Sequence, residues 1–169
     1  AFNAAMSYTL KRAVTGNGKE TSIDFNRALV SMGTLMPVFE GTATQNEGQM
    51  YFNWQDNSGI GNAEDTDIAM ILVYNKDKET AVYDTEAALR SGCHAVLQLP
   101  ADWQNDELIA YLSFCSADGS CVANSIRLTV TMTERMSKAT IPDNAIFIRS
   151  LINHSFSPKG FQDRSYRSG

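Results

Sequence analysis

The residues with the clearest chemical potential lie between positions 56 and 67, where oxygen-bearing side chains loosely follow a calcium-binding loop. Such a loop places oxygen ligands at positions one, three, nine and twelve and a glycine at position six. Gly61 holds the sixth position, and the four ligand positions hold Asp56, Ser58, Glu64 and Asp67. However, Ile60 occupies position five, position twelve is Asp instead of Glu, and the flanking segments are predicted strands. The favoured interpretation is a surface loop whose Asn, Asp and Gly residues form turns, with calcium binding as the alternative.

Groups that could support catalysis are sparse. Histidine occurs only at His94 and His154. Neither has a Cys, Ser or carboxylate neighbour at the spacing of a nucleophile and its base. His94 alternates with residues predicted to point inward, which favours a solvent-facing position. The sequence Gly16-Asn17-Gly18 follows a predicted helix instead of preceding one, the wrong context for phosphate binding. We therefore predict a protein that is not an enzyme and uses no cofactor.

The three cysteines, Cys93, Cys115 and Cys121, are too few for a disulfide scaffold and lack the spacing of a zinc site. If residues 117–119 form a three-residue turn, Cys115 faces Cys121 across a hairpin. Cross-strand neighbours have Cβ atoms about 4.5–5.5 Å apart, close to disulfide geometry. A Cys115–Cys121 disulfide in an oxidising compartment is one hypothesis. The other hypothesis is that the two cysteines are unbonded small side chains that fill the end of the hairpin.

Alternating apolar residues on both sides of that turn predict a β-hairpin over residues 106–130. With it, about seven short strands separated by regular turn signals predict a mainly β fold, a sandwich over residues 38–130. Residues 1–37 are predicted to form a helix and a connector that pack on the sandwich. The residues predicted to fill the space between its sheets are Met50, Phe52, Trp54, Leu72, Leu97, Leu112 and Phe114.

The strand predicted at residues 68–75 is apolar on both faces. An outer strand of a two-layered sandwich is expected to be polar on its solvent side. With Leu72 assigned to the core, Ile71 and Val73 are predicted to form a surface that something must cover. The N-terminal helix, the C-terminal arm and a partner subunit are the three candidates.

The chain has 169 residues, of which 43% are hydrophobic and 20% charged, as in an ordinary globular protein. Its net charge of −5 argues against nucleic acid as a partner. From residue 131 onward, six Lys/Arg stand against three Asp/Glu, a charge of +3, so the remainder carries −8. A basic tail on an acidic body can pair with a neighbouring copy.

No segment approaches the ~18–20 apolar residues of a membrane-spanning helix. The sequence starts at Ala1 instead of Met, which is expected of a chain that has lost a leader or of a fragment. We favour an extracellular or cell-surface location, and the cytoplasm stays open as the alternative.

Residues 131–169 are predicted to form an extended arm, because so few residues cannot bury a core of their own. Within the arm, residues 145–152 form a compact β-prone segment that presents Ile146, Ile148 and Ile152 on one side, with Arg149 beside them. Such a segment can add as a strand to an exposed sheet edge of another copy. An arm folded back onto its own domain is the alternative.

These observations predict a non-enzymatic assembly protein that binds other copies of itself through the arm, for example in an extracellular filament or surface assembly. The alternative is a cell-surface ligand-binding or adhesive domain that uses the loop at residues 56–67.

Three segments occur in the order typical of fibronectin type III-like domains: MYFNW, AVLQLPADW and SADGSCVANSIRLTV. More closely, Phe2 to Val130 is similar to the C-terminal part of an uncharacterised Bacteroidota protein family. The phrases FNAAMSYTLKRAVTG, DNSGIGNAEDTD, VYN and SFCSADG carry this resemblance. It implies an immunoglobulin or fibronectin type III-like β-sandwich with an N-terminal helix, and it implies no activity.

Overall fold

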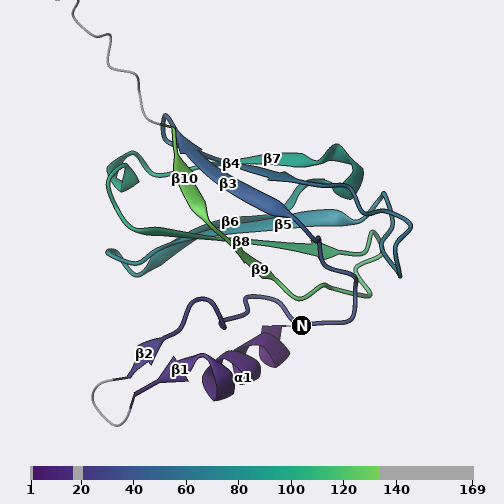
Figure 1. Ribbon diagram of the computed structural model, residues 1–169, viewed down its shortest axis with the longest axis horizontal. Coiled ribbons are helices and arrows are strands. Elements are labelled where there is room, and N and C mark those ends of the chain that lie inside the picture. Colours follow the sequence, from purple (N-terminus) through teal and green to yellow (C-terminus); the bar gives the residue numbers. More distant parts are fainter. Residues whose placement is uncertain (1, 17–20, 134–169) are drawn as a thin grey trace, which may run out of the picture. The chain divides into compact units, whose positions relative to one another are not determined.

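The computed structural model describes residues 2–16 and 21–133 of the chain. Residues 1–133 form one compact unit. Strands dominate its described part, and two sheets pack face to face (Figure 1). The prediction of a mainly β fold with a short N-terminal helix is therefore confirmed. The predicted contact residues of the arm lie outside the described residues: Ile146, Ile148, Arg149 and Ile152.

The first sheet contains four strands in the order β10-β3-β4-β7. Their bounds are β3 Gly41–Asn46, β4 Gln49–Trp54, β7 His94–Gln98 and β10 Val130–Met132. Strands β3, β4 and β7 pair antiparallel, whereas β10 runs parallel to β3. Glu47 and Gly48 join β3 to β4 with φ of 48° and 80°. Positive φ at both central residues is the turn that best matches the twist of two hairpin strands.

The second sheet also has four strands, in the antiparallel order β6-β5-β8-β9. Their bounds are β5 Ile68–Asn75, β6 Thr80–Leu89, β8 Leu108–Cys115 and β9 Ile126–Leu128. Two short 3-10 helices, η1 Arg90–Gly92 and η2 Ala101–Trp103, flank β7.

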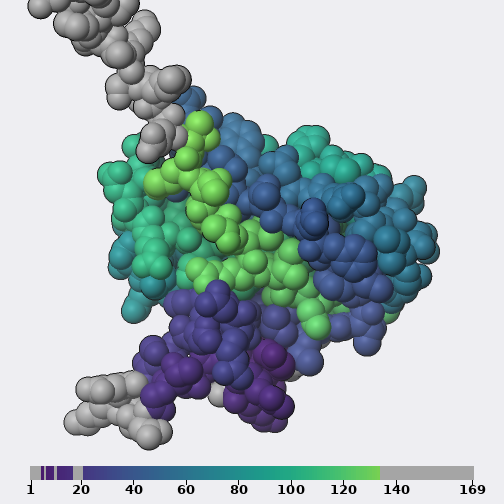
Figure 2. Space-filling model, viewed as in Figure 1, coloured from purple at the N-terminus to yellow at the C-terminus, as the bar shows by residue number. Residues whose placement is uncertain are grey.

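The predicted hairpin is present, but its return strand divides between the two sheets. Strand β9 pairs with β8, and after Thr129 the chain crosses to the first sheet as β10. In Figure 2 this crossing is the green band between the purple N-terminal segment and the blue of β3. Thr131 and Met132, predicted as the start of the arm, therefore belong to the sandwich.

The core between the sheets contains six of the seven predicted residues. Met50, Phe52, Trp54, Leu97, Leu112 and Phe114 are all buried in one cluster. Leu72 is the exception, because along β5 it is the alternate residues that point inward. Ile71 and Val73, only 1% and 0% exposed, lie in the core, and the prediction that they form a contact surface is wrong. Since both alternating sets of this strand are apolar, the sequence pattern alone did not define which set faces inward.

The N-terminal segment covers part of the outer face of the second sheet. Its elements are α1 Phe2–Arg12, β1 Val14–Thr15 and β2 Ser22–Ile23. The ring of Phe25 packs on the ring of Tyr74 of β5, with centroids 5.5 Å apart. The backbone carbonyl of Phe25 accepts a 2.8 Å hydrogen bond from the hydroxyl of Tyr111 of β8. The Ser31 hydroxyl donates to Ser113 at 2.6 Å. The N-terminal helix was one of three candidates for covering this sheet, but among the described residues these contacts come from residues 25–31, which follow the helix.

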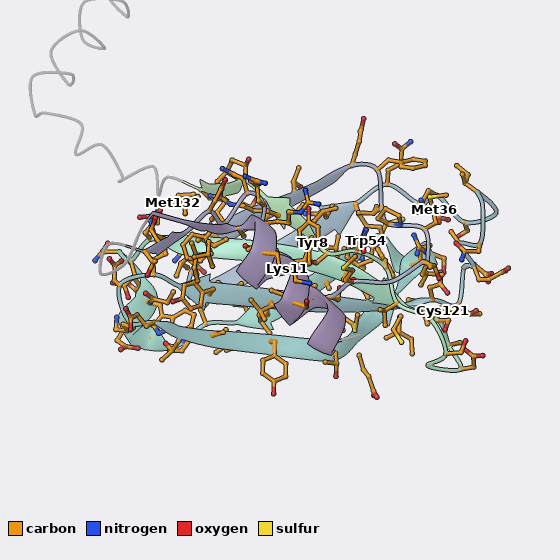
Figure 3. The ribbon with its side chains drawn as sticks, turned by 90° about the horizontal axis from the view of Figure 1, so that it is seen from below. Tyr8, Lys11, Met36, Trp54, Cys121 and Met132 are labelled. Carbon is orange, nitrogen blue, oxygen red and sulfur yellow. The ribbon has the colours of Figure 1, made fainter. Side chains whose placement is uncertain are left out.

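The helix is held to this segment by Thr9. The Thr9 hydroxyl donates to the carbonyl of Leu29 and accepts from its amide, both at 3.1 Å. Ala5 and Ala13 are buried, and in Figure 3, which looks from below, α1 is on the near side of the molecule. The first sheet faces the opposite side of the sandwich (Figure 1).

Candidate functional site

Arg90 is a fully buried cation that begins η1, directly after β6. Its Nε donates to Asp67 Oδ2 at 3.0 Å, its Nη1 to Asn57 Oδ1 at 2.6 Å, and its Nη2 to the carbonyl of Met36 at 2.8 Å. The guanidinium fork thus meets three acceptors from two segments, the loop at residues 56–67 and the connector at Met36. A buried charge is tolerated only when it is paired and hydrogen-bonded, so these acceptors are the reason that Arg90 can be buried.

Two aromatic residues complete the surroundings of Arg90. Its guanidinium carbon lies 3.9 Å from the ring centroid of Phe114, a cation–π contact. The indole nitrogen of Trp54 donates to the Arg90 carbonyl at 2.7 Å, and the Trp54 and Phe114 rings meet edge to face with centroids 5.6 Å apart. Because Trp54 belongs to the first sheet and Phe114 to the second, Arg90 joins both sheets to the loop at residues 56–67.

The electrostatics of Arg90 point to structure and not to reactivity. Burial lowers the pKa of its guanidinium, and the adjacent carboxylates of Asp67 and Asp56 oppose that shift. An arginine pKa starts so far above neutrality that the group stays protonated in proteins. A permanently charged group that is saturated by its own chain can neither transfer a proton nor bind a ligand. We therefore assign it a structural role.

The loop at residues 56–67 does not bring the four proposed calcium ligands together. Asp67 is buried and bonded to Arg90 and to the amide of Glu64. Asp56 accepts from the amide and hydroxyl of Ser58, and these bonds lower the pKa of its carboxyl. Among the described residues, no group of His, Cys, Asp or Glu is arranged to hold a metal ion. The structure thus uses the polar residues of the loop for turns and for pairing Arg90.

The cysteine pair has a register different from the predicted one. Cys115 bridges to Val122 instead of Cys121, and the amide of Ser116 donates to the Cys121 carbonyl at 2.9 Å. The reason lies in the turn, where Asp118 accepts three hydrogen bonds from Ser116 and Ser120 and so holds a wider loop than the three residues expected. Both thiols are free.

His94 is exposed on β7, as predicted, and its Nδ1 contacts the carbonyl of Gly92 at 2.8 Å. This backbone contact does not prepare the ring for acid–base chemistry, which needs a positioned nucleophile or substrate. His154, the second histidine, lies outside the described residues.

The remaining candidate is one edge of the second sheet, the edge formed by β6. Within residues 2–16 and 21–133, β6 lies at the end of its sheet and pairs only with β5. Residues 80–84 pair regularly with β5. Beyond them β6 bulges, because Asp84 and Ala88 are four positions apart on β6 whereas Met70 alone lies between their partners on β5. Most of β6 is exposed, including Tyr83 at 67%. We call residues 79–86 the β6 edge.

The β6 edge is acidic, and the part of the chain that the structure describes does not neutralise it. Glu79, Asp84 and Glu86 are all exposed and form no salt bridge with a described residue. The nearby cations Lys76 and Lys78 pair instead with carboxylates around β8 and η2. Sequence reasoning did not identify this edge, although three acids in and beside one predicted strand were a usable signal.

A hollow of ≈ 120 Å³ lies beside the β6 edge, on the outer face of the second sheet. It is lined mainly by apolar side chains, among them Val30, Met70, Leu72 and Tyr83. Val30 comes from the N-terminal segment, and Met70, Leu72 and Tyr83 are side chains of the sheet that this segment leaves partly uncovered. The hollow is large enough for one branched aliphatic side chain.

Comparison with known proteins gives one match. Residues 1–129 match the model of a family of unknown function, DUF6266. No curated protein and no solved structure was found to match the sequence. Among residues 2–16 and 21–133, no helix combines the length and the apolar character needed to cross a membrane.

Proposed function

The chain belongs to the DUF6266 family of unknown function, and we propose that it is a non-enzymatic assembly protein whose C-terminal arm adds as a strand to the β6 edge of another copy. The observation that carries the proposal is the exposed, acidic and unpaired edge of the second sheet. An added strand obtains much of its affinity from main-chain hydrogen bonds, and the pockets beside the edge give specificity.

Charge supports this pairing of arm and edge. The arm carries +3, with Arg149 inside its β-prone segment, whereas residues 1–130 carry −8. Complementary charge favours encounter of the correct surfaces and is weakened by salt. The acids of the β6 edge are therefore suitable partners for the basic residues of the arm.

Shape supports the same pairing. The segment at residues 145–152 presents Ile146, Ile148 and Ile152 on one side if it is extended. The hollow of ≈ 120 Å³ beside Tyr83 would accept one of these side chains. The segment is separated from Thr133 by about a dozen residues, which can span roughly 40 Å when extended. This reach suits a neighbouring copy, and it also suits the arm's own domain.

We infer in addition that the sandwich is of the immunoglobulin or fibronectin type III kind. The support is its strand order, β3-β4-β7 against β6-β5-β8-β9, with the last strand crossing to run parallel to β3. An extracellular filament or surface assembly is the setting that we propose for such a module. The loop at residues 56–67 gives little support to the alternative of a ligand-binding loop, because its inner residues are engaged with Arg90.

Deletion of residues 140–169 tests the proposed function by sedimentation velocity over a range of protein concentrations. We expect the full chain to form oligomers that salt weakens, and the truncated chain to be a monomer with an unchanged cooperative unfolding transition. The charge reversals Asp84→Lys and Glu86→Lys, each made alone, should weaken association, whereas Glu40→Lys, the same single charge reversal beside the first sheet, should not. Oligomers that survive the deletion would show that the arm is not the contact between copies. A full chain that is monomeric would exclude assembly through the arm altogether.

A further inference from the structure

The outer face of the first sheet carries no charged side chain. Its outward residues alternate with the buried ones along all four strands. They are Thr42, Thr44, Asn46, Gln49, Tyr51, Asn53, His94, Val96, Gln98 and Thr131. In a chain of which 20% is charged, a face of ten such positions without Asp, Glu, Lys or Arg is a distinct chemical surface. We call it the neutral face.

Side-chain hydrogen bonds hold the neutral face in a defined arrangement. The Tyr51 hydroxyl donates to Gln49 Oε1 at 2.6 Å, and the Gln49 amide donates to Gln98 Oε1 at 3.2 Å. Thr44 and Thr131 join their hydroxyls at 3.1 Å. Because Gln49 lies two residues along the same strand from Tyr51, its bond to the phenol requires the ring to lie along the sheet. The aromatic ring therefore presents a face to solvent at the middle of the sheet.

A shallow hollow of ≈ 380 Å³ lies where β3 begins and β4 ends, next to the neutral face. Its lining includes Thr42 and Asn53, the cross-strand pair next to Thr44 and Tyr51, together with Glu40 and Gln55 at its rim. The hollow thus combines a hydroxyl, two amides and one carboxylate. Its volume is of the size of a small ligand site.

From this arrangement we propose that the neutral face binds a neutral polysaccharide. Amides and hydroxyls both donate and accept hydrogen bonds, which matches the hydroxyl groups of a sugar. The half-buried ring of Tyr51 offers an apolar plane to the C–H face of a pyranose, since an aromatic ring combines a large apolar surface with a polar edge. Long charged ligands would find no opposite charges on this face.

A second copy of the chain fits the neutral face less well than a glycan does. Stable protein interfaces have an apolar centre surrounded by a polar rim. On the neutral face the apolar contribution comes from Tyr51 and Val96, and every other outward residue is polar. An extended sugar chain lying across the strands can use hydrogen bonds along its whole length, so it needs no such centre.

Affinity electrophoresis of the full chain in native gels tests the proposal with cellulose ether, xylan, mannan and dextran as the neutral probes. Each mobility is divided by that of the same protein in a gel without polysaccharide. We expect at least one neutral polymer to retard the chain and the anionic polymer polygalacturonate to have no such effect. Tyr51→Ala should weaken binding by about tenfold or more, which corresponds to about 1.4 kcal/mol.

Two further variants separate binding from folding. Asn53→Asp places a carboxylate on the neutral face without changing the shape of the side chain, and it should weaken binding while thermal unfolding is unchanged. Ile23→Ala removes an exposed apolar side chain of the N-terminal segment, away from the neutral face and from the β6 edge, and should bind as the wild-type chain does. The proposal is overturned if no neutral polymer retards the chain, if Tyr51→Ala and Asn53→Asp bind like Ile23→Ala, or if Tyr51→Ala acts only by shifting the oligomeric state.

Discussion

The guanidinium of Arg90 lies over the ring of Phe114, 3.9 Å from its centroid, between the last residues of β4 and β8. The ring contacts one face of the cation, while Asp67, Asn57 and the Met36 carbonyl occupy its edge. A charged residue with no exposed surface is therefore part of the same packing that includes Trp54. The buried arginine fixes the long loop at residues 56–67 to the sheets that it connects.

Arg90→Met should destabilise the protein by about 3–5 kcal/mol, because removing one partner of a buried ion pair leaves the carboxylate of Asp67 uncompensated. Arg90→Lys should also be destabilising, since a single ammonium cannot reproduce the three-acceptor fork. Urea unfolding followed by tryptophan fluorescence measures both. Arg127→Met, at an exposed arginine of β9, is the matched control and should change stability by no more than about 0.5 kcal/mol. Equal stability of the Arg90→Met and Arg127→Met variants would contradict the assigned role of Arg90.

The sequence predicted the inter-sheet core well where one face of a strand is polar. In β4, Met50, Phe52 and Trp54 alternate with Gln49, Tyr51 and Asn53, and the structure buries the first set. In β5 both sets are apolar, so the pattern could not place Leu72, and the deciding contacts come from Phe25 in the distant N-terminal segment. Alternation is informative only when the two faces differ in polarity.

The packing around Arg90 could not be predicted from the sequence for a different reason. Charged residues are rarely buried unless they are paired, so a lone arginine after a predicted strand is assigned to the surface. Its partners, Met36, Asn57 and Asp67, come from positions far from Arg90 along the chain. Only the tertiary structure brings them together. The β6 edge and the neutral face likewise depend on the order of the strands in their sheets.

The cysteines give a prediction about oxidation state. Because Cys115 is paired with Val122 in the ladder, we expect three reactive thiols per chain in protein unfolded without reductant. In the folded protein Cys115 should react slowly, since burial raises the pKa of its thiol and less thiolate is present. Thiol titration measures both quantities, and a Cys93→Ser variant should lose one thiol. A single reactive thiol in the unfolded wild-type chain, together with none in the Cys93→Ser variant, would show that Cys115 and Cys121 form a disulfide.

Tyr111 provides a pH-dependent test of the attachment of the N-terminal segment. Burial raises its pKa from 10.0 to about 12, an effect that the nearby Arg127 partly opposes, and its hydroxyl donates to the Phe25 carbonyl. The fold thus favours the neutral phenol over the tyrosinate. This contribution to stability is fully present below the ordinary pKa and is lost as the pH rises from 10.0 through about 12.

We expect Tyr111→Phe to cost about 1 kcal/mol at neutral pH, the typical value of one hydrogen bond. The wild-type chain should lose stability above pH 10.0 because Tyr111 ionises more readily in the unfolded state, and the variant should lack this loss. Unfolding free energies measured between neutral pH and pH 12 compare the two proteins, and hydrogen exchange reports whether residues 21–31 open first. Tyr83→Phe, at an exposed tyrosine of β6, should keep the wild-type pH profile. If Tyr111→Phe keeps it as well, the hydrogen bond between Tyr111 and Phe25 does not fasten the N-terminal segment to the second sheet.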